Sequence, residues 1–128
     1  MTTNNVEKFR FLNWEVYRNT RELISLVLVL VRKLPREYRY ELGSQIIRSS
    51  FSILLNIAEG SGKTSDREMN RFIEVALGSV YETLAGFDVL RDNKLVAEED
   101  FQKVYDLLGS ISSQLGGFKK KLSVGRVS

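Results

Sequence analysis

Four stretches of the chain place apolar residues three and four positions apart, the spacing that puts them on one face of an α-helix. They cover residues 13–33, 37–59, 65–93 and 97–122. Pro35, the single proline, stands between the first two, where it keeps the preceding residue out of the helical region. With 128 residues the chain has the length of one domain. The pattern and the short connections predict an all-α fold, an antiparallel up-down-up-down four-helix bundle.

The first stretch contains six consecutive apolar residues, Leu26–Val31. Successive residues point in different directions round a helix, so this part is apolar on every side and must be covered on every side. One bundle covers only the inner side, and we therefore predict a homo-oligomer. A buried strand is the alternative, but the amphipathic lead-in from Trp14 to Leu23 favours a helix. A membrane-spanning helix needs about 20 apolar residues, so we predict no membrane contact.

Signals for helix ends mark the middle of the chain. Ser65 and Glu68 match the capping box, which satisfies backbone N–H groups at the start of a helix. Gly60 and Gly62 suit the end of the second helix, where a left-handed residue caps the last carbonyl groups. The third helix is therefore predicted to begin at Ser65.

The last stretch carries one narrow apolar stripe, which predicts a helix with a wet outer side. The stripe consists of Phe101, Val104, Leu108, Ile111, Leu115, Phe118 and Leu122. Gly116-Gly117 should weaken the end of this helix, because glycine costs about 1 kcal/mol in a helix interior. The bundle is predicted over residues 13–122, with an N-terminal tail at 1–12 and a C-terminal tail at 123–128.

The composition removes the commonest catalytic and metal-binding side chains. With no cysteine and no histidine, the chain lacks thiolates, the most frequent general base and the most frequent neutral metal ligand. Glu98-Glu99-Asp100 stands where negative charge complements a helix N-terminus. Ile57–Thr64 ends like a phosphate-binding loop, but it has Ile57 where that loop needs glycine, and it follows a helix. We predict a non-enzymatic, cytoplasmic protein without metal, cofactor or small-molecule substrate.

Residues 45–82 carry a family resemblance. Its most specific part is Asn56-Ile57-Ala58-Glu59-Gly60-Ser61-Gly62. We define nine residues of this pattern as the motif residues: Gln45, Arg48, Asn56, Glu59, Gly60, Gly62, Arg71, Gly78 and Glu82. The pattern resembles the four-helix-bundle family of 23S rRNA intervening-sequence proteins over nearly the whole chain. It differs at Leu54-Leu55, where many members carry a proline and a small residue.

The resemblance implies a four-helix bundle and a homo-oligomer, often a ring of five subunits. It also implies kinship with the accessory proteins of diversity-generating retroelements, which bind nucleic acid and a reverse transcriptase. It implies no established activity.

We predict that the nine motif residues are structural. Antiparallel packing of the second and third helices should bring Arg48 level with Glu82 and Glu59 level with Arg71, with an ion pair at each position. Removing one partner of a buried pair costs about 3–5 kcal/mol, whereas an exposed pair contributes less than about 1 kcal/mol. The small residues that should let these helices approach closely are Ser49, Ser50, Ser52, Ala76, Gly78 and Ser79.

Charge is the remaining functional signal. The net charge is +3, and residues 1–63 hold ten basic and six acidic side chains, against nine and ten in residues 64–128. Arg32, Lys33, Arg36 and Arg39 cluster around the first turn. Such a patch can neutralise phosphates, and it predicts an oligomeric accessory protein that binds RNA or DNA. The alternatives are a solvated helix end that complements the helix dipole, and a protein–protein interaction scaffold that binds no nucleic acid.

Overall fold

The structure is a computed structural model that describes the backbone of residues 8–127 and the side chains of residues 8–123. This part of the chain is all-helical and contains no strand, as predicted. Its long helices are α2 (Glu15–Arg32), α4 (Ser44–Ser61), α5 (Asp66–Asp92) and α6 (Glu98–Val127). The shorter elements are the 3-10 turn η1 (Arg10–Asn13), the helix α3 (Arg36–Tyr38) and the π-helical turn η2 (Arg39–Gly43). None of the helices in this part of the chain has the length and hydropathy that crossing a membrane requires.

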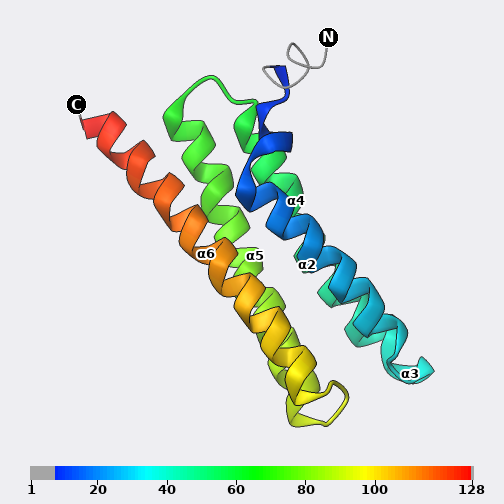
Figure 1. Ribbon diagram of the computed structural model, residues 1–128. Coiled ribbons are helices and arrows are strands. Elements are labelled where there is room, and N and C mark those ends of the chain that lie inside the picture. The colour runs from blue at the N-terminus through cyan, green and yellow to red at the C-terminus, as the bar shows by residue number, and fades with distance from the viewer. Residues whose placement is uncertain (1–7, 128) are drawn as a thin grey trace.

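Each long helix packs against two others. α2 contacts α4 and α6, and α5 contacts the same two helices. In Figure 1 the start of α2, the end of α6 and the α4–α5 connection lie at one end, and α3 and the α5–α6 turn lie at the other. The apolar stripes predicted from the sequence meet in one hydrophobic core. Its largest fully buried side chains include Leu23, Val27, Ile53, Ile57, Ile73, Phe87, Leu108, Ile111 and Leu115.

The core leaves part of α2 uncovered. Val27 is fully buried, whereas Leu28 is 39% exposed and Val29 is 44% exposed. The helix ends at Arg32, before Pro35, as the sequence predicted. The apolar run Leu26–Val31 therefore has an inner side in the core and an outer side that this single chain does not bury.

The turn between α4 and α5 confirms one prediction and corrects another. The Glu68 N–H donates to Ser65 Oγ at 3.1 Å, which is the predicted N-terminal cap of α5. The left-handed cap predicted at Gly60 and Gly62 is wrong. Gly62 has a φ of −90°, in the right-handed region, and its N–H donates to the Glu59 carbonyl at 3.1 Å. Within the described residues, Lys94 alone has a positive φ, of 59°.

Gly60 is required for packing rather than for capping. It is buried inside the last turn of α4, and a Cβ atom on it would lie 3.0 Å from Phe72 Cβ. That distance is shorter than ordinary van der Waals contact between carbon atoms. The glycine therefore lets α4 and α5 approach closely beside the turn.

Two helix boundaries differ from the prediction because tertiary contacts decide them. The predicted second helix, from Glu37, is interrupted by η2, and α4 begins at Ser44. Gly43, at this junction, lies so close to Val31 that a Cβ atom would be 2.6 Å from Val31 Cγ1. α6 continues through Gly116-Gly117 to Val127, past the predicted end at residue 122, because core packing outweighs the low helix propensity of glycine. Of the predicted tail 1–12, residues 1–7 lie outside the described part, and η1 occupies its end.

Small polar residues line the contact between α4 and α5. Ser49 Oγ lies 2.8 Å from Thr83 Oγ1, and Ser79 Oγ donates to Ser52 Oγ at 2.9 Å. Gly78 is not part of this contact, contrary to the prediction: it is exposed, and a Cβ atom there would meet no atom within 4 Å. Gly86 takes that role instead, since a Cβ on it would lie 2.8 Å from Ile46 Cγ1.

Candidate nucleic-acid interface

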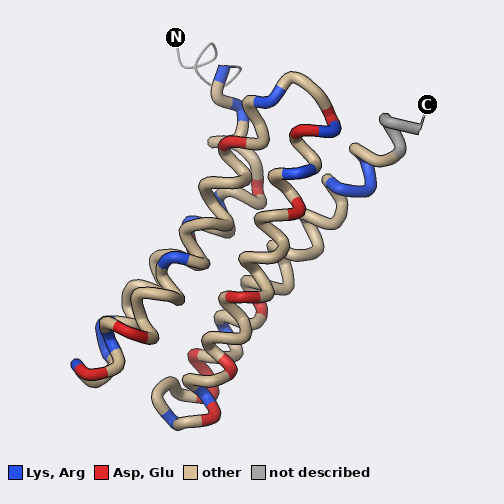
Figure 2. The backbone as a smooth tube through the Cα atoms, turned by 180° about the vertical axis from the view of Figure 1, so that it is seen from behind, with Lys and Arg blue, Asp and Glu red and all other residues tan. Residues whose placement is uncertain are grey.

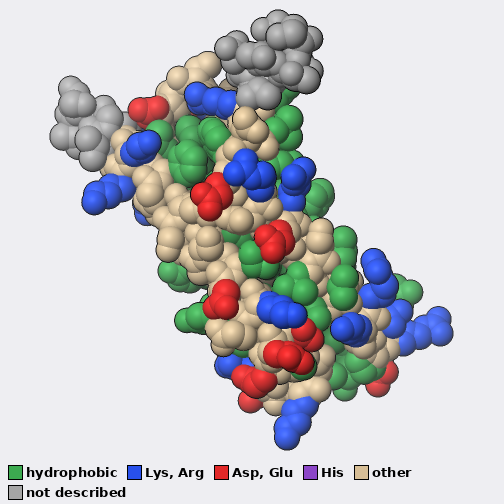
Figure 3. Space-filling model, viewed as in Figure 1, with side chains coloured by type: hydrophobic (Ala, Val, Ile, Leu, Met, Phe, Trp, Pro, Cys, Tyr) green, Lys and Arg blue, Asp and Glu red, His purple; other side chains and the backbone are tan. Residues whose placement is uncertain are grey.

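The basic turn, which we define as Arg32, Lys33, Arg36 and Arg39, connects α2 to α4. Leu34, which is 2% exposed, anchors the turn in the core, and the four basic side chains around it are all exposed. Arg39 Nη2 donates to the Leu34 carbonyl oxygen at 3.1 Å, which holds that guanidinium beside the turn. Figure 2 shows basic and acidic segments side by side at this end of the helices, and Figure 3 shows basic side chains projecting from the surface there.

The four cations have no carboxylate partner among the described side chains. The ion pairs there join Arg91 to Asp88 and Glu98, and Lys119 to Glu74. Glu37 and Glu41 belong to the same segment but form no ion pair with any side chain that the structure describes, and residues 32–41 keep a net charge of +2. The basic turn can therefore contact an anion without first breaking an internal ion pair.

Two exposed tyrosines stand within the basic turn. Tyr38 is 40% exposed and Tyr40 is 73% exposed, and they alternate with Arg39 in the segment Arg36-Glu37-Tyr38-Arg39-Tyr40. Aromatic rings beside cations are the usual surface for stacking single-stranded bases. The interleaving of basic and aromatic residues is the sequence signal by which these tyrosines could have been found.

The two predicted ion pairs among the motif residues do not form. Arg48, Glu82, Glu59 and Arg71 are all exposed, and no carboxylate lies within ion-pair distance of either arginine among the described residues. The predicted alignment of α4 and α5 along their length was nearly right, because the next residues in the chain, Ser49 and Thr83, pair with each other. The predicted direction of the Arg48 side chain was wrong. A neighbouring residue points about 100° away round a helix, so Arg48 turns outward when Ser49 faces α5.

The same geometry explains why the second predicted pair, Glu59 with Arg71, does not form. Gly60 and Phe72 meet at the α4–α5 contact, so the preceding residues, Glu59 and Arg71, point away from each other. Asn56 is half-buried and donates from Nδ2 to the Ser52 carbonyl oxygen at 2.8 Å, within its own helix. Of the nine motif residues, Gly60 thus has a packing role in this single chain.

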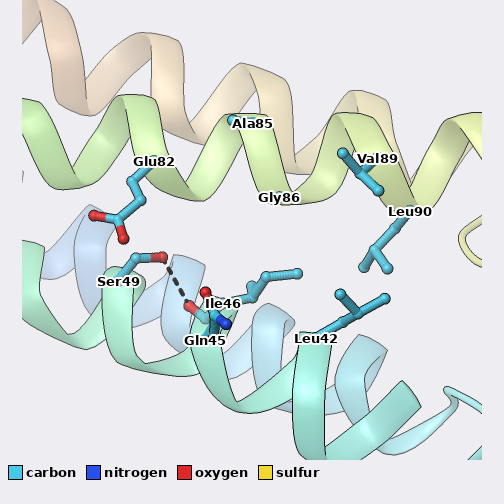
Figure 4. Close-up of a pocket in the computed structure, with 9 residues that line it drawn as sticks. All are labelled: Leu42, Gln45, Ile46, Ser49, Glu82, Ala85, Gly86, Val89 and Leu90. Atoms are coloured by element: carbon cyan, nitrogen blue, oxygen red, sulfur yellow. Dashed lines mark hydrogen bonds between the residues drawn. The ribbon is translucent and has the colours of Figure 1, made fainter. Parts of the chain in front are cut away.

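Gln45 and Glu82 lie at a groove of about 260 Å³ between α4 and α5. Figure 4 shows the Glu82 carboxylate directed toward Ser49, whose hydroxyl donates to the Ile46 carbonyl oxygen at 3.1 Å. The other lining residues are apolar or small: Leu42, Ile46, Ala85, Gly86, Val89 and Leu90. One carboxylate and one amide give this groove a polar rim over an apolar floor. Across the described residues, no three acidic side chains come together as potential metal ligands.

A second basic cluster lies at the opposite end of the molecule. Lys119, Lys120 and Lys121 are exposed on α6, and Lys121 lines a groove of about 430 Å³ with Trp14. Arg10 Cζ lies 5.7 Å from the Trp14 ring centroid, a distance at which a cation interacts with an aromatic ring. The run of three lysines is the sequence signal by which this cluster could have been found.

Comparison with known proteins places the chain in a family. The family described as 23S rRNA-intervening sequence protein matches residues 13–117. The chain belongs to this family. A solved structure from Bacteroides thetaiotaomicron VPI-5482, described as a protein with unknown function from the S23 ribosomal protein family, is similar with a TM-score of 0.77. The two are 22% identical, over 82% of this chain and 98% of that chain, so the likeness shows the fold alone. No curated protein matches.

Proposed function

We propose that this member of the 23S rRNA-intervening sequence protein family is a non-enzymatic, cytoplasmic homo-oligomer that binds nucleic acid through the basic turn. The observation that carries the proposal is the exposure of Arg32, Lys33, Arg36 and Arg39, unpaired among the described residues, beside Tyr38 and Tyr40. Each subunit is an antiparallel up-down-up-down bundle. This arrangement is supported by the contacts between α4 and α5, where Ser49 meets Thr83 and the later residue Ser52 meets the earlier residue Ser79.

The oligomer is supported by the apolar side chains that one chain leaves open. Leu28 and Val29 are 39% and 44% exposed on α2, and Phe51 and Leu55 are 46% and 49% exposed on α4. Burying apolar surface contributes about 25 cal/mol per Å², so contact between copies at these residues is favourable. The family resemblance implies rings of five subunits, so we propose a pentamer, in which the basic turn is repeated by symmetry.

Binding at the basic turn should depend strongly on salt and weakly on sequence. Cations that neutralise phosphates release condensed counterions, which makes affinity fall as salt rises. Phosphate contacts carry no sequence information by themselves, and stacking on tyrosine accepts every base. The kinship with retroelement accessory proteins implied by the sequence resemblance agrees with this mode of binding.

The test compares two variants with equal changes in charge. In the first, Arg32, Lys33, Arg36 and Arg39 are all changed to glutamine. In the second, the exposed residues Arg21, Arg67, Lys103 and Lys120 are changed to glutamine. Fluorescence anisotropy with a labelled single-stranded RNA and with a DNA duplex gives the dissociation constant of each. We expect the first variant to bind much more weakly while light scattering shows an unchanged mass, and the second to bind nearly as the unmodified protein does. Equal weakening in both variants would mean that net charge, and not the basic turn, determines binding.

The second candidate function is a protein–protein interaction scaffold. It is favoured by the partly exposed Phe51 and Leu55, which require only a protein surface as partner. If the unmodified protein binds neither RNA nor DNA at about 50 mM salt, where electrostatic attraction is strong, the scaffold replaces nucleic-acid binding as the better account.

A further inference from the structure

A groove between α5 and α6 presents two tyrosine rings to solvent. Tyr81 on α5 is 69% exposed, and Tyr105 on α6 is 51% exposed. Both line the same groove, of about 400 Å³. The other lining residues are Leu84, Ala85, Asp88, Arg91 and Phe101. Exposed aromatic rings over an apolar floor are typical of protein-interaction sites.

One part of this groove already holds a guanidinium group. Arg91 Cζ lies 3.9 Å from the Phe101 ring centroid, well within the distance of about 6 Å for a cation–π contact. The Asp88 carboxylate lies 2.6 Å from Arg91 Nη2 and helps to hold it there. The ring centroids of Phe101 and Tyr105 lie 6.1 Å apart. Among the described residues, no cation lies over the ring of Tyr81 or Tyr105, so the groove continues beyond Arg91 as an unoccupied aromatic surface.

The charge around this groove differs from the rest of the protein. Residues 81–106 hold seven acidic and three basic side chains, a net charge of −4, whereas the remaining residues carry a net charge of +7. Figure 3 shows acidic side chains gathered near the end where α5 turns into α6. This surface attracts cations and repels phosphates. The groove lining itself holds one carboxylate, Asp88, and one guanidinium, Arg91, so the acidic excess belongs to the helices and the turn around the groove. That excess favours a basic partner over nucleic acid.

We propose that the α5–α6 groove binds an arginine side chain presented by a basic segment of another protein. The planar guanidinium of arginine stacks on aromatic rings and pairs with carboxylates at the same time, which a lysine ammonium does less well. In this contact the guanidinium lies over the rings of Tyr81 and Tyr105 and faces Asp88, repeating the arrangement that Arg91 makes with Phe101. The contact does not require nucleic-acid binding at the basic turn, because that turn connects α2 to α4 and contributes no residue to the α5–α6 groove.

The probe is a short fluorescein-labelled helical peptide with arginines and leucines on one face. A matched peptide carries citrulline, which has the shape of arginine without its charge. Fluorescence anisotropy measures the binding of both peptides to the full chain and to variants Tyr81→Ser, Tyr105→Ser and Tyr81→Phe. Val75→Ser serves as the control, because Val75 is a 49% exposed side chain of α5 outside this groove. Circular dichroism confirms that each variant is folded.

We expect the arginine peptide to bind more tightly than the citrulline peptide. Loss of one ring should raise the dissociation constant about tenfold, in line with a cation–π contact between partly desolvated groups. Tyr81→Phe should bind as the unmodified protein does, because phenylalanine keeps the ring, and Val75→Ser should have no effect. Equal binding of both peptides, or equal binding by the Tyr81→Ser and Val75→Ser variants, would overturn the proposal. So would a fall in the mass of Tyr81→Ser by light scattering, since a second copy of the chain would then occupy the groove.

Discussion

Two glycines of α5 should respond in opposite ways to the same substitution. Gly78 and Gly86 both lie in the interior of α5, where alanine is favoured over glycine by about 1 kcal/mol. A Cβ atom at residue 78 meets open space, whereas at residue 86 it would lie 2.8 Å from Ile46 Cγ1 and 3.2 Å from Ile46 Cδ1. Ile46 is 5% exposed, so its side chain must shift within the contact between α4 and α5 to make room for that atom. Overpacking of this kind costs about 1–3 kcal/mol.

The magnitudes follow from these terms. Gly78→Ala should stabilise the protein by about 0.5–1 kcal/mol. Gly86→Ala gains the same helix propensity but also introduces overpacking against Ile46. The net effect should be a destabilisation of up to about 2 kcal/mol. The difference in the free energy of unfolding between the two variants isolates the cost of overpacking the contact between α4 and α5. Urea unfolding followed by circular dichroism measures it, at one protein concentration because association contributes to apparent stability.

A third substitution tests the physical cause. In an Ile46→Ala background the space beside residue 86 is open, so Gly86→Ala should become stabilising there, although Ile46→Ala alone costs about 2–5 kcal/mol. If Gly78→Ala and Gly86→Ala shift the unfolding midpoint equally and in the same direction, α4 and α5 are not packed as closely as the Gly86–Ile46 distance indicates.

Two further predictions concern the outer surface. Val29→Glu places a charge on the uncovered side of α2, so light scattering should show a smaller assembly while circular dichroism shows the same helix content; an unchanged mass would remove α2 from the interface. Arg48→Ala removes an exposed side chain without an ion-pair partner among the described residues, and it should change the free energy of unfolding by less than about 0.5 kcal/mol; a loss of about 3 kcal/mol or more would show that Arg48 is buried and paired in the assembly.

The sequence predicted the helices because each carries a regular apolar stripe. Phe101, Leu108 and Leu115 are buried at the predicted spacing, and the capping residue Ser65 marks the start of α5. The errors lie where contacts distant in the chain decide the outcome. The role of Gly86 depends on Ile46, which is forty residues earlier, and no local pattern reveals that distance. α6 passes through Gly116-Gly117 because packing stabilises that helix more than two glycines weaken it.

The candidate interface was predictable in part. The basic turn follows directly from the spacing of its four cations around Pro35. Their exposure in the single chain comes from the fold, in which Leu34 alone of this turn is buried. The ion pairs predicted for Arg48 and Glu59 failed because the level of two residues along packed helices does not determine the direction of their side chains. A rotation of one residue, about 100°, turns a cross-helix contact into a solvent-facing side chain. The α5–α6 groove is lined by Tyr81 and Tyr105, which are far apart in the sequence and come together only in the folded chain.

The salt dependence of binding tests the central proposal most directly. The dissociation constant of the unmodified protein for a labelled single-stranded RNA is measured by anisotropy from about 50 to 200 mM salt, the range in which phosphate contacts lose affinity steeply. Four neutralised phosphates for each engaged subunit predict a slope of about −3 in a plot of log affinity against log salt. The variant with glutamine at Arg32, Lys33, Arg36 and Arg39 should have both a lower affinity and a flatter slope. An equally steep slope in that variant, or no binding by the unmodified protein at about 50 mM salt, would contradict nucleic-acid binding through the basic turn.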